Sequence, residues 1–584
     1  MKRFFSILVL TYVIIGIFSM QAEEFDYDQE YRAQYHYSPM RNWMNDPNGL
    51  VYNEATKEYH MFYQYCQTLE EDQNAKYWGH AVSKDLVHWQ ELQAAISPDD
   101  IGSIWSGSCV IDKYNTSGFF DDSTPAGARM VALFTYAGGD TTQGFEKQGI
   151  AYSKDNGLTW TKYEGNPVLG SVRDGNTIYD GGFRDPKVIW YEDDSYQNGG
   201  IWLMVVAGGK ARIFTSPDLK NWTYNSTMTY MDGTTPIESE CPDFYPLSVQ
   251  GDESDADKWI YSAAGRSYVV GELIKDSESK FTFKAETNML TLMNLPTDMY
   301  AAQTFFNDPK GRRIAVYWMI DLSSKEENNL GEKAWDGVQS LPMEMKLLKD
   351  ADGEYQLRAY PVEELNALKG DTALLEVSNE TFSGTYEKVS AVTGELLYID
   401  IVFDPGTASR IVFDLRAGGD EKTTVSYNAK SGMMTLVRSE SGAFIKENTS
   451  TIVPLSENGT VHMQIYVDRS VVDIFTDTGA NSLHGLIYPA KSSVGLRLRS
   501  SGGEATIKSL NIYEMKSAWN KDYTVNYTPY PSEPFTTDAS DSGDMNTTEM
   551  ILIIVAAVLG TALIGLCGAG MLIKKKNKPE GDSE

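Results

Sequence analysis

The segment Ser83-Lys84-Asp85-Leu86-Val87-His88-Trp89 is the first of three similar stretches in the N-terminal half of the chain. The other two run from Ser153 to Trp160 and from Ser216 to Trp222, so their starts are almost evenly spaced. Each follows a short run that favours a β-strand, and we expect an Asp-containing turn with a tryptophan packed beside it. This repeat predicts several small sheets arranged around an axis, as in a β-propeller. Three unrelated turns in an ordinary β-sandwich are the alternative.

The pattern changes to longer alternating segments from about Asp371 onward. Met463, Ile465 and Val467 alternate with more polar neighbours, and the stretch from Val494 to Leu498 does the same. A period of two places one face on a core and the other toward water, which is typical of a β-sandwich. This second part offers no cluster of catalytic residues, so structural support is its expected role and carbohydrate binding the alternative.

The composition excludes several classes of protein. Of the 584 residues 42% are hydrophobic, which is typical of folded domains and not of disordered chains. The formal charge of -31 disfavours nucleic acid as a partner, because so acidic a surface repels phosphate backbones. Four cysteines are too few for a disulfide scaffold, and the six histidines show no H-E-x-x-H pattern, so we expect neither a metal nor another cofactor.

Both ends of the chain carry targeting signals. Residues 1–22 read as a secretory signal peptide, with a basic start, an apolar run and the small residue Ala22. Residues 550–573 are free of charge and precede Lys574-Lys575-Lys576, which predicts one membrane-spanning helix with a cytoplasmic tail at 574–584. Residues 519–549 read as a flexible stalk. The predicted topology is a single-pass type I membrane protein with its bulk outside the cell or in a lumen.

Sequons for N-glycosylation agree with an outer location without proving it. Eight lie between the two targeting segments, at Asn115, Asn221, Asn225, Asn379, Asn448, Asn458, Asn526 and Asn546.

Three acidic residues stand in conspicuous settings in the first half. They are Asp46 before Pro47, Asp185 between Arg184 and Pro186, and Glu240 before Cys241. Any one of them alone could form a turn, because Asp-Pro is a common turn dipeptide. On successive blades, however, they could meet in one funnel, and glycoside hydrolysis requires a pair of carboxylates.

The order of the surrounding motifs resembles that of glycoside hydrolase family 32, which contains the invertases, levanases and exo-inulinases. The similarity runs from about Tyr31 to Met515. The motifs that carry it are Asn42 to Gly49, Phe62-Tyr63-Gln64, Trp78-Gly79-His80, Trp105-Ser106-Gly107-Ser108, Phe183-Arg184-Asp185-Pro186 and Glu240-Cys241-Pro242-Asp243. The resemblance implies an all-β fold with a five-bladed β-propeller catalytic domain, here at 30–345, followed by a β-sandwich at 370–515.

The resemblance also implies roles for individual residues. Asp46 would be the nucleophile and Glu240 the general acid/base, while Asp185 and Arg184 would hold sugar hydroxyls. Further residues would line the fructose pocket, namely Asn45, Gln64, Trp78, Trp105 and Ser106. For these roles Asp46 must be ionised, and Glu240 must hold a proton near neutral pH. Cys241 either tunes that proton affinity or is a plain buried residue.

The expected activity is that of a retaining exo-β-fructofuranosidase acting on sucrose, inulin or levan. A fructosyltransferase uses the same residues, so it remains an alternative, as does a surface carbohydrate-binding protein that has lost activity. Retention of all three carboxylates argues against the last of these. The sequence does not decide between the substrates, or whether Cys66 and Cys109 form a disulfide.

Overall fold

The computed structural model describes residues 27–519, apart from 174–175, 180–181, 239, 252–256, 292–297, 320–333, 351, 444–446, 478 and 480. The predicted signal peptide, membrane span and cytoplasmic tail lie outside these ranges, and so does the predicted stalk after Trp519. Trp519 itself stacks on Tyr27 with ring centroids 4.3 Å apart, so the expected start of the stalk is packed onto the fold. Within the described ranges no helix is long and apolar enough to cross a membrane.

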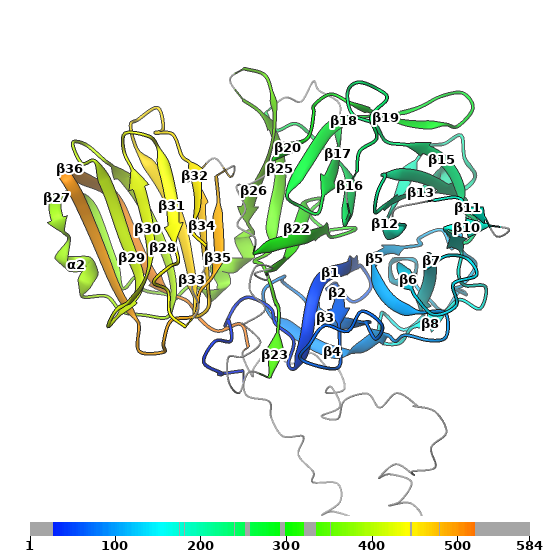
Figure 1. The fold of residues 1–584 in the computed structure, drawn as a ribbon, viewed down its shortest axis with the longest axis horizontal. Coiled ribbons are helices and arrows are strands. Elements are labelled where there is room, and N and C mark those ends of the chain that lie inside the picture. The colour runs from blue at the N-terminus through cyan, green and yellow to red at the C-terminus, as the bar shows by residue number, and fades with distance from the viewer. Residues whose placement is uncertain are drawn as a thin grey trace, which may run out of the picture. The chain divides into compact units, whose positions relative to one another are not determined.

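Five mainly antiparallel sheets and one short hairpin make up the part of the chain before residue 362 (Figure 1). The first contains β1 (Asn42–Asn53), β2 (Glu58–Tyr65), β3 (Tyr77–Ser83) and β4 (Trp89–Ile96), and β23 (Trp335–Asp336) pairs with β1. The second contains β5 (Ser103–Ile111), β6 (Met130–Ala137), β7 (Glu146–Ser153), β8 (Thr161–Lys162) and β9 (Leu169–Gly170). A short hairpin of β10 (Val172–Arg173) and β11 (Asn176–Thr177) follows.

The remaining three sheets repeat this plan. The third contains β12 (Arg184–Glu192), β13 (Gly200–Ala207), β14 (Arg212–Ser216) and β15 (Thr223–Thr227). The fourth contains β16 (Pro242–Leu247), β17 (Lys258–Ala263), β18 (Ser267–Lys275), β19 (Phe281–Ala285) and β20 (Leu290–Thr291). The fifth contains β21 (Met299–Thr304), β22 (Arg313–Met319), β24 (Val338–Gln339), β25 (Met343–Lys349) and β26 (Tyr355–Pro361).

The first strand of every sheet contacts the first strand of the next, in the order β1, β5, β12, β16 and β21, and β21 contacts β1 again. These contacts close a ring of five sheets around a common axis, which is a five-bladed β-propeller. The predicted propeller is therefore confirmed, and the ordinary sandwich is excluded for this half of the chain.

The three similar stretches form the same turn in three blades, each between the third and fourth strands. In the first, the Ser83 hydroxyl donates to Asp85 at 3.1 Å, and Trp89 Nε1 donates to the carbonyl oxygen of Leu86 at 2.9 Å. The same two bonds recur in the second stretch, from Ser153 to Asp155 and from Trp160 to Gly157. They recur again in the third, from Ser216 to Asp218 and from Trp222 to Leu219. The sequence pattern that suggested blades thus has a specific structural cause.

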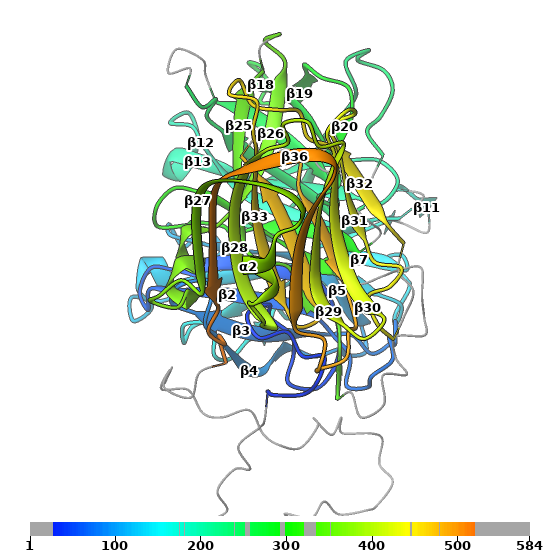
Figure 2. The ribbon, with the colours of Figure 1, turned by 90° about the vertical axis from the view of Figure 1, so that its left-hand side faces the viewer.

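The C-terminal part is a β-sandwich. Its strands are β27 (Leu375–Thr385), β28 (Leu396–Asp404), β29 (Arg410–Gly418), β30 (Glu421–Asn428), β31 (Met433–Val437), β32 (Thr449–Ile452), β33 (Val461–Asp468), β34 (Val471–Thr476), β35 (Leu483–Leu486) and β36 (Gly495–Glu514), with one short helix, α2 (Glu387–Ser390). The long strand β36 pairs first with β29 and then, beyond Gly502 and Gly503, with β28. Figure 2 shows β36 arching from one side of the sandwich to the other. One strand therefore belongs to both layers, and the predicted alternation at Met463, Ile465 and Val467 faces the core between them.

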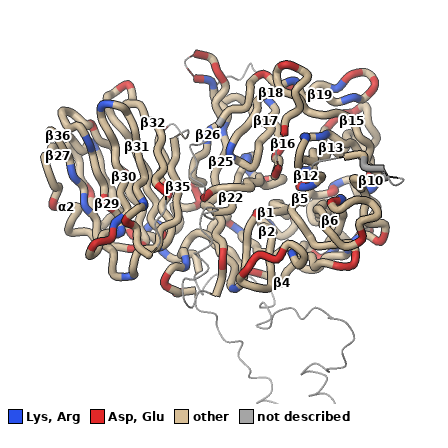
Figure 3. The backbone as a smooth tube through the Cα atoms, viewed as in Figure 1, with Lys and Arg blue, Asp and Glu red and all other residues tan. Residues whose placement is uncertain are grey.

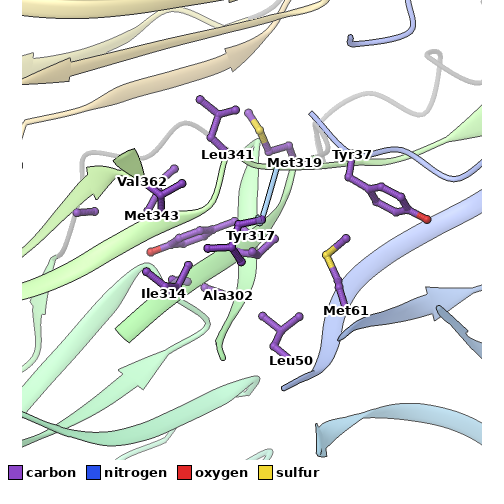
Figure 4. Packing of buried hydrophobic residues seen from close by; sticks show 14 of the residues in the cluster. Tyr37, Leu50, Met61, Ala302, Ile314, Tyr317, Met319, Leu341, Met343 and Val362 are labelled. Atoms are coloured by element: carbon purple, nitrogen blue, oxygen red, sulfur yellow. The ribbon is translucent and has the colours of Figure 1, made fainter. Parts of the chain in front are cut away.

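The largest apolar cluster joins the first, fourth and fifth blades. Figure 4 shows part of it, with Leu50 from β1, Met61 from β2, Tyr317 from β22 and Met343 from β25. Met343 is fully buried. Because this cluster also includes Tyr466 and Phe475 of the sandwich, burial of apolar surface holds the two parts together.

Buried ion pairs add to the contact between propeller and sandwich. Asp468 of the sandwich accepts hydrogen bonds from the backbone N–H of Gln34, Tyr35 and His36. Arg438 of the sandwich binds Asp298, which directly precedes β21, and both side chains are fully buried. The expected supporting role of the second part is consistent with these contacts.

The cysteines of the described residues are unpaired. Cys66 and Cys109 are both buried and free, so they do not form the disulfide that the sequence left open.

Candidate active site

A pocket of about 300 Å³ opens where the five inner strands meet. All five blades contribute to its wall. The lining residues are Asn45, Asp46, Gln64, Glu71, Gln73, Lys76, Trp105, Ser106, Glu146, Arg184, Asp185, Glu240, Cys241 and Tyr300. The three acidic residues singled out from the sequence, which are far apart along the chain, therefore lie in one pocket.

The inner strands depart from regular pairing at the pocket. The pairing register shifts between Met44 and Pro47 in β1, between Trp105 and Gly107 in β5, and between Arg184 and Lys187 in β12. Asp185 and Cys241 also have positive φ angles of 60° and 44°, which are uncommon outside glycine. Bulges of this kind re-aim side chains, and local backbone strain is typical of functional sites.

Asp46 lines the pocket and is partly buried. The Ser106 hydroxyl donates to its Oδ2 atom at 2.7 Å, and Asn45 Nδ2 donates to its Oδ1 atom at 3.2 Å. Burial raises the pKa of Asp46 above its usual range, while the positive charge of Lys76 and the Ser106 hydrogen bond act in the opposite direction. These two neighbours favour the ionised form that a nucleophile needs.

Asp185 is buried beside Asp46. Its Oδ2 atom accepts the backbone N–H of Cys241 at 2.9 Å and lies 3.8 Å from Arg184 Nε. Burial raises the pKa of Asp185 to about 7, against the opposing charge of Arg184. A carboxyl group in this position can accept or donate a hydrogen bond near neutral pH.

Glu240 is the most exposed of the three and is held by two donors. Arg184 Nη2 donates to its Oε2 atom at 2.6 Å, and the Tyr300 hydroxyl donates to Oε1. Burial would raise the pKa of Glu240, but the hydrogen bonds from Tyr300 and Arg184 outweigh burial and lower it. Both donors therefore stabilise the carboxylate, whereas the expected role of general acid requires a proton on Glu240.

Two domain profiles cover almost the whole described chain. Residues 36–361 match the Glycosyl hydrolases family 32 N-terminal domain, and residues 364–514 match the Glycosyl hydrolases family 32 C terminal domain. The chain belongs to glycosyl hydrolase family 32.

Curated relatives in family 32 agree with this assignment. A levanase of Bacillus subtilis is 35% identical over 543 residues, which cover 89% of this chain and 76% of the relative. An extracellular exo-inulinase of Aspergillus niger is 32% identical and covers 85% of this chain and 97% of its own length. Among solved structures, the exo-inulinase of Aspergillus awamori is 30% identical, with a TM-score of 0.73, and the match covers 85% of this chain and all of that one. The chain is therefore a glycoside hydrolase of the β-fructofuranosidase type.

Five of the six binding residues predicted from the family 32 motifs line the pocket, namely Asn45, Gln64, Trp105, Ser106 and Arg184. Trp78 does not, because it is fully buried behind the pocket wall. Its Nε1 atom donates to the carbonyl oxygen of Trp105 at 3.0 Å, and its ring packs against Phe62 and Phe134. Trp78 thus supports Trp105 and presents no face to a sugar.

Family motifs alone did not identify several residues of the pocket. They are Glu71, Gln73, Lys76, Glu146 and Tyr300. Glu71 and Lys76 pair at 2.5 Å on the loop between β2 and β3, and Lys76 Nζ also donates to Asn45 Oδ1 at 3.3 Å. Lysine in an otherwise acidic loop (Glu70-Glu71-Asp72) was the available sequence signal for this pair. Tyr300 follows Asp298-Met299, and no sequence feature there marks it as a pocket residue.

Proposed function

We propose that the protein is a retaining exo-β-fructofuranosidase. It removes terminal non-reducing β-D-fructofuranosyl units from sucrose, inulin or levan by a double-displacement mechanism. The observation that carries this proposal is the convergence of Asp46, Asp185 and Glu240 in one pocket. A volume of about 300 Å³ lies at the small end for ligand pockets, which suits one or two sugar rings and so supports attack at a chain end.

In the first step Asp46 attacks the anomeric carbon of fructose, while Glu240 protonates the departing oxygen. In the second step Glu240 removes a proton from water, and the water displaces Asp46. Cys241 Sγ lies 3.7 Å from Asp46 Oδ2, and Cys241 is the neighbour of Glu240 in the chain. Asp46 and Glu240 line the same pocket, and the charge of Glu240 acts to raise the pKa of Asp46, which supports the short carboxylate separation that retaining enzymes need.

Proton donation requires that substrate binding raise the proton affinity of Glu240. Arg184 is the group that can mediate this change, because its guanidinium reaches both Glu240 and Asp185. Sugar hydroxyls that engage Arg184 weaken its hold on Glu240, and the bound sugar also excludes water from the carboxyl group. Both effects favour the protonated acid at the moment when it is needed.

The test is a parallel assay of the purified protein on sucrose, inulin and levan, with products separated by size. Free fructose as the first product from all substrates supports exo-hydrolysis. Fructosylated oligosaccharides as the main products from sucrose would favour the fructosyltransferase alternative. Binding without turnover would favour the inactive carbohydrate-binding protein. Early products analysed by NMR report the anomeric configuration, and inverted fructose would contradict the retaining mechanism.

A neutral sugar is also the partner that suits the charge of the molecule. Figure 3 shows Asp and Glu on loops of both the propeller and the sandwich, in keeping with the formal charge of -31. Nucleic acid is not proposed as a partner, because like charges repel.

For localisation we propose a type I membrane protein whose catalytic part faces outward. The apolar run at 550–573 and the basic residues after it support this topology. Four sequon asparagines, Asn221, Asn379, Asn448 and Asn458, are exposed and could carry glycans. The full chain should remain in the membrane fraction after alkaline carbonate washing, whereas a chain that ends at Asn520 should be secreted. Release of the full chain by the wash would contradict the proposed anchor.

A further inference from the structure

Glu146, at the start of β7, binds Arg184, the same arginine that binds Glu240. Its Oε1 atom accepts a hydrogen bond from Arg184 Nη1 at 2.9 Å, and its Oε2 atom accepts the backbone N–H of Phe183. The side chain is 12% exposed, so solvent screens it only weakly. The Glu146 carboxylate, from the second blade, thus binds both the backbone and the Arg184 side chain where the first strand of the third blade begins.

We propose that Glu146 is a positioning residue that limits how strongly Arg184 binds Glu240 and thereby keeps Glu240 able to protonate the leaving group. This inference rests on the proposed function, because it takes Glu240 as the general acid.

The argument begins with the shape of the guanidinium group. Arginine and a carboxylate form their strongest contact when two N–H groups bind both oxygens of the same carboxylate. In this pocket the two terminal nitrogens of Arg184 bind different carboxylates, Nη1 to Glu146 and Nη2 to Glu240. Glu146 therefore prevents the two-fold contact with Glu240.

Other charged and titratable groups face this cluster from several elements. Arg184 is faced by Glu146, Asp185 and Glu240, and Glu240 is faced by Arg184 and Tyr300. Arg266 lies over the Tyr300 ring, 5.0 Å from its centroid. The other such groups around the pocket are Asp46, Cys241, Lys76 and Glu71. Loss of the Glu146 charge leaves all of these in place. The effect of that loss on Glu240 is therefore transmitted through Arg184 and through the missing negative charge itself.

Both routes act in the same direction. Without Glu146, Arg184 is free to turn toward Glu240, and one source of repulsion for the Glu240 carboxylate disappears. Each change stabilises the ionised acid, so its proton is lost at lower pH. The alkaline limb of the pH profile, where activity falls as the acid ionises, should then move to lower pH.

The test compares Glu146→Gln with the wild type, measuring kcat/KM against pH on two substrates. Sucrose needs protonation of its leaving group, whereas an aryl β-fructofuranoside with an acidic phenol does not. For Glu146→Gln on sucrose, we expect the alkaline limb to move down by about one pH unit. At neutral pH kcat/KM on sucrose should fall by about tenfold, a part of what general acid catalysis contributes. On the aryl substrate the loss should stay within about threefold.

Two further variants make the result specific. Glu146→Asp keeps the charge at a shorter reach, so its alkaline limb should lie between those of the wild type and Glu146→Gln. Glu164 is exposed on the turn between β8 and β9 of the same blade and does not line the pocket, so Glu164→Gln removes one negative charge outside the site. Its profile should match that of the wild type, which controls for the change in net charge.

The outcomes separate this inference from the proposed function. Equal losses on both substrates at every pH, or a wild-type alkaline limb in both Glu146 variants, would overturn the role of Glu146. An inactive wild type would instead contradict the proposed function. Should Glu146→Gln fail to fold, the limb of Glu146→Asp alone decides the question in the same way.

Discussion

The Sγ atom of Cys241 lies 3.7 Å from the Oδ2 atom of Asp46. Burial raises the pKa of Cys241 well above its usual range, and the nearby carboxylates of Asp46 and Asp185 add to this effect. The thiol therefore stays protonated and acts as a weak hydrogen-bond donor to the nucleophile. It does not compete with Asp46 as a nucleophile itself, because only a thiolate would do so.

Two substitutions of Cys241 should shift the acid limb of the pH profile in opposite directions. Cys241→Ser offers a stronger donor, which stabilises ionised Asp46 and moves the acid limb of kcat/KM to lower pH. Cys241→Ala removes the donor and moves the limb to higher pH. Measurement of kcat/KM on sucrose between pH 3 and 8 checks both. Acid limbs identical to that of the wild type in both variants would show that the thiol has no influence on Asp46.

Asp46 and Glu240 should differ in their response to removal. Asp46→Ala should abolish turnover of every substrate, because no covalent intermediate can form. Glu240→Ala should lose activity on sucrose while its first step survives on an activated aryl fructoside. Rapid-quench measurement of phenol release separates the two cases. An equal loss on both substrates in Glu240→Ala would contradict its role as the acid.

Asp185→Asn should reduce kcat more than it changes KM. The pocket places Asp185 beside Arg184 and Asp46, where we expect its carboxyl group to hold sugar hydroxyls more tightly as the ring flattens in the transition state. An interaction that strengthens in the transition state lowers kcat when it is removed. Steady-state kinetics on sucrose tests this, and a variant with normal kcat would exclude the role.

The same substitution should stabilise the fold in a pH-dependent way. The pKa of Asp185 is raised from 3.8 to about 7, so between these values the native state holds a proton that the unfolded chain has lost. Stability of the wild type therefore falls as pH rises across this interval. Asp185→Asn does not titrate, so its advantage in free energy of unfolding should grow to about 3 kcal/mol between pH 4 and 7. Thermal midpoints of both proteins at these two pH values check the prediction.

His36 should stabilise the contact between propeller and sandwich only below alkaline pH. Burial disfavours its charge, but Asp473 and Asp468 outweigh burial and raise the pKa of His36 from 6.5 to about 9. A raised pKa contributes stability below pH 6.5, and that contribution is lost as pH rises through about 9. His36→Gln should therefore cost about 3 kcal/mol more at pH 6 than above pH 9. Denaturant titrations of both proteins at the two pH values measure this difference, and equal costs would contradict a charged His36.

The sequence predicted the repeating part of the fold because its cause is local. Ser83, Asp85 and Trp89 bond within one turn, so the pattern is visible wherever that turn recurs. Asp46, Asp185 and Glu240 could be identified because each stands in a family motif. Trp78 was assigned to the pocket for the same reason, although a tryptophan that lines a wall and one that lies behind it look alike in sequence.

Residues that act across blades could not be predicted in this way. Glu146 and Arg184 are 38 positions apart and meet because their strands are neighbours in the ring. Tyr300 reaches Glu240 from the next blade, and this contact reverses the expected pKa shift of the acid. The electrostatics of the pocket depend on such pairs, and a motif read along one chain segment does not contain them.

Closure of the ring also bears on how the protein acquires activity during folding. The pocket takes residues from all five blades, and β1 and β21, which complete the ring, are more than half the described chain apart in sequence. Contacts between such distant segments form late, because the entropy of closing a long loop must be overcome first. Individual sheets can therefore regain their secondary structure while the pocket is still incomplete. Recovery of catalytic activity on refolding should lag behind recovery of the far-ultraviolet circular dichroism of the strands.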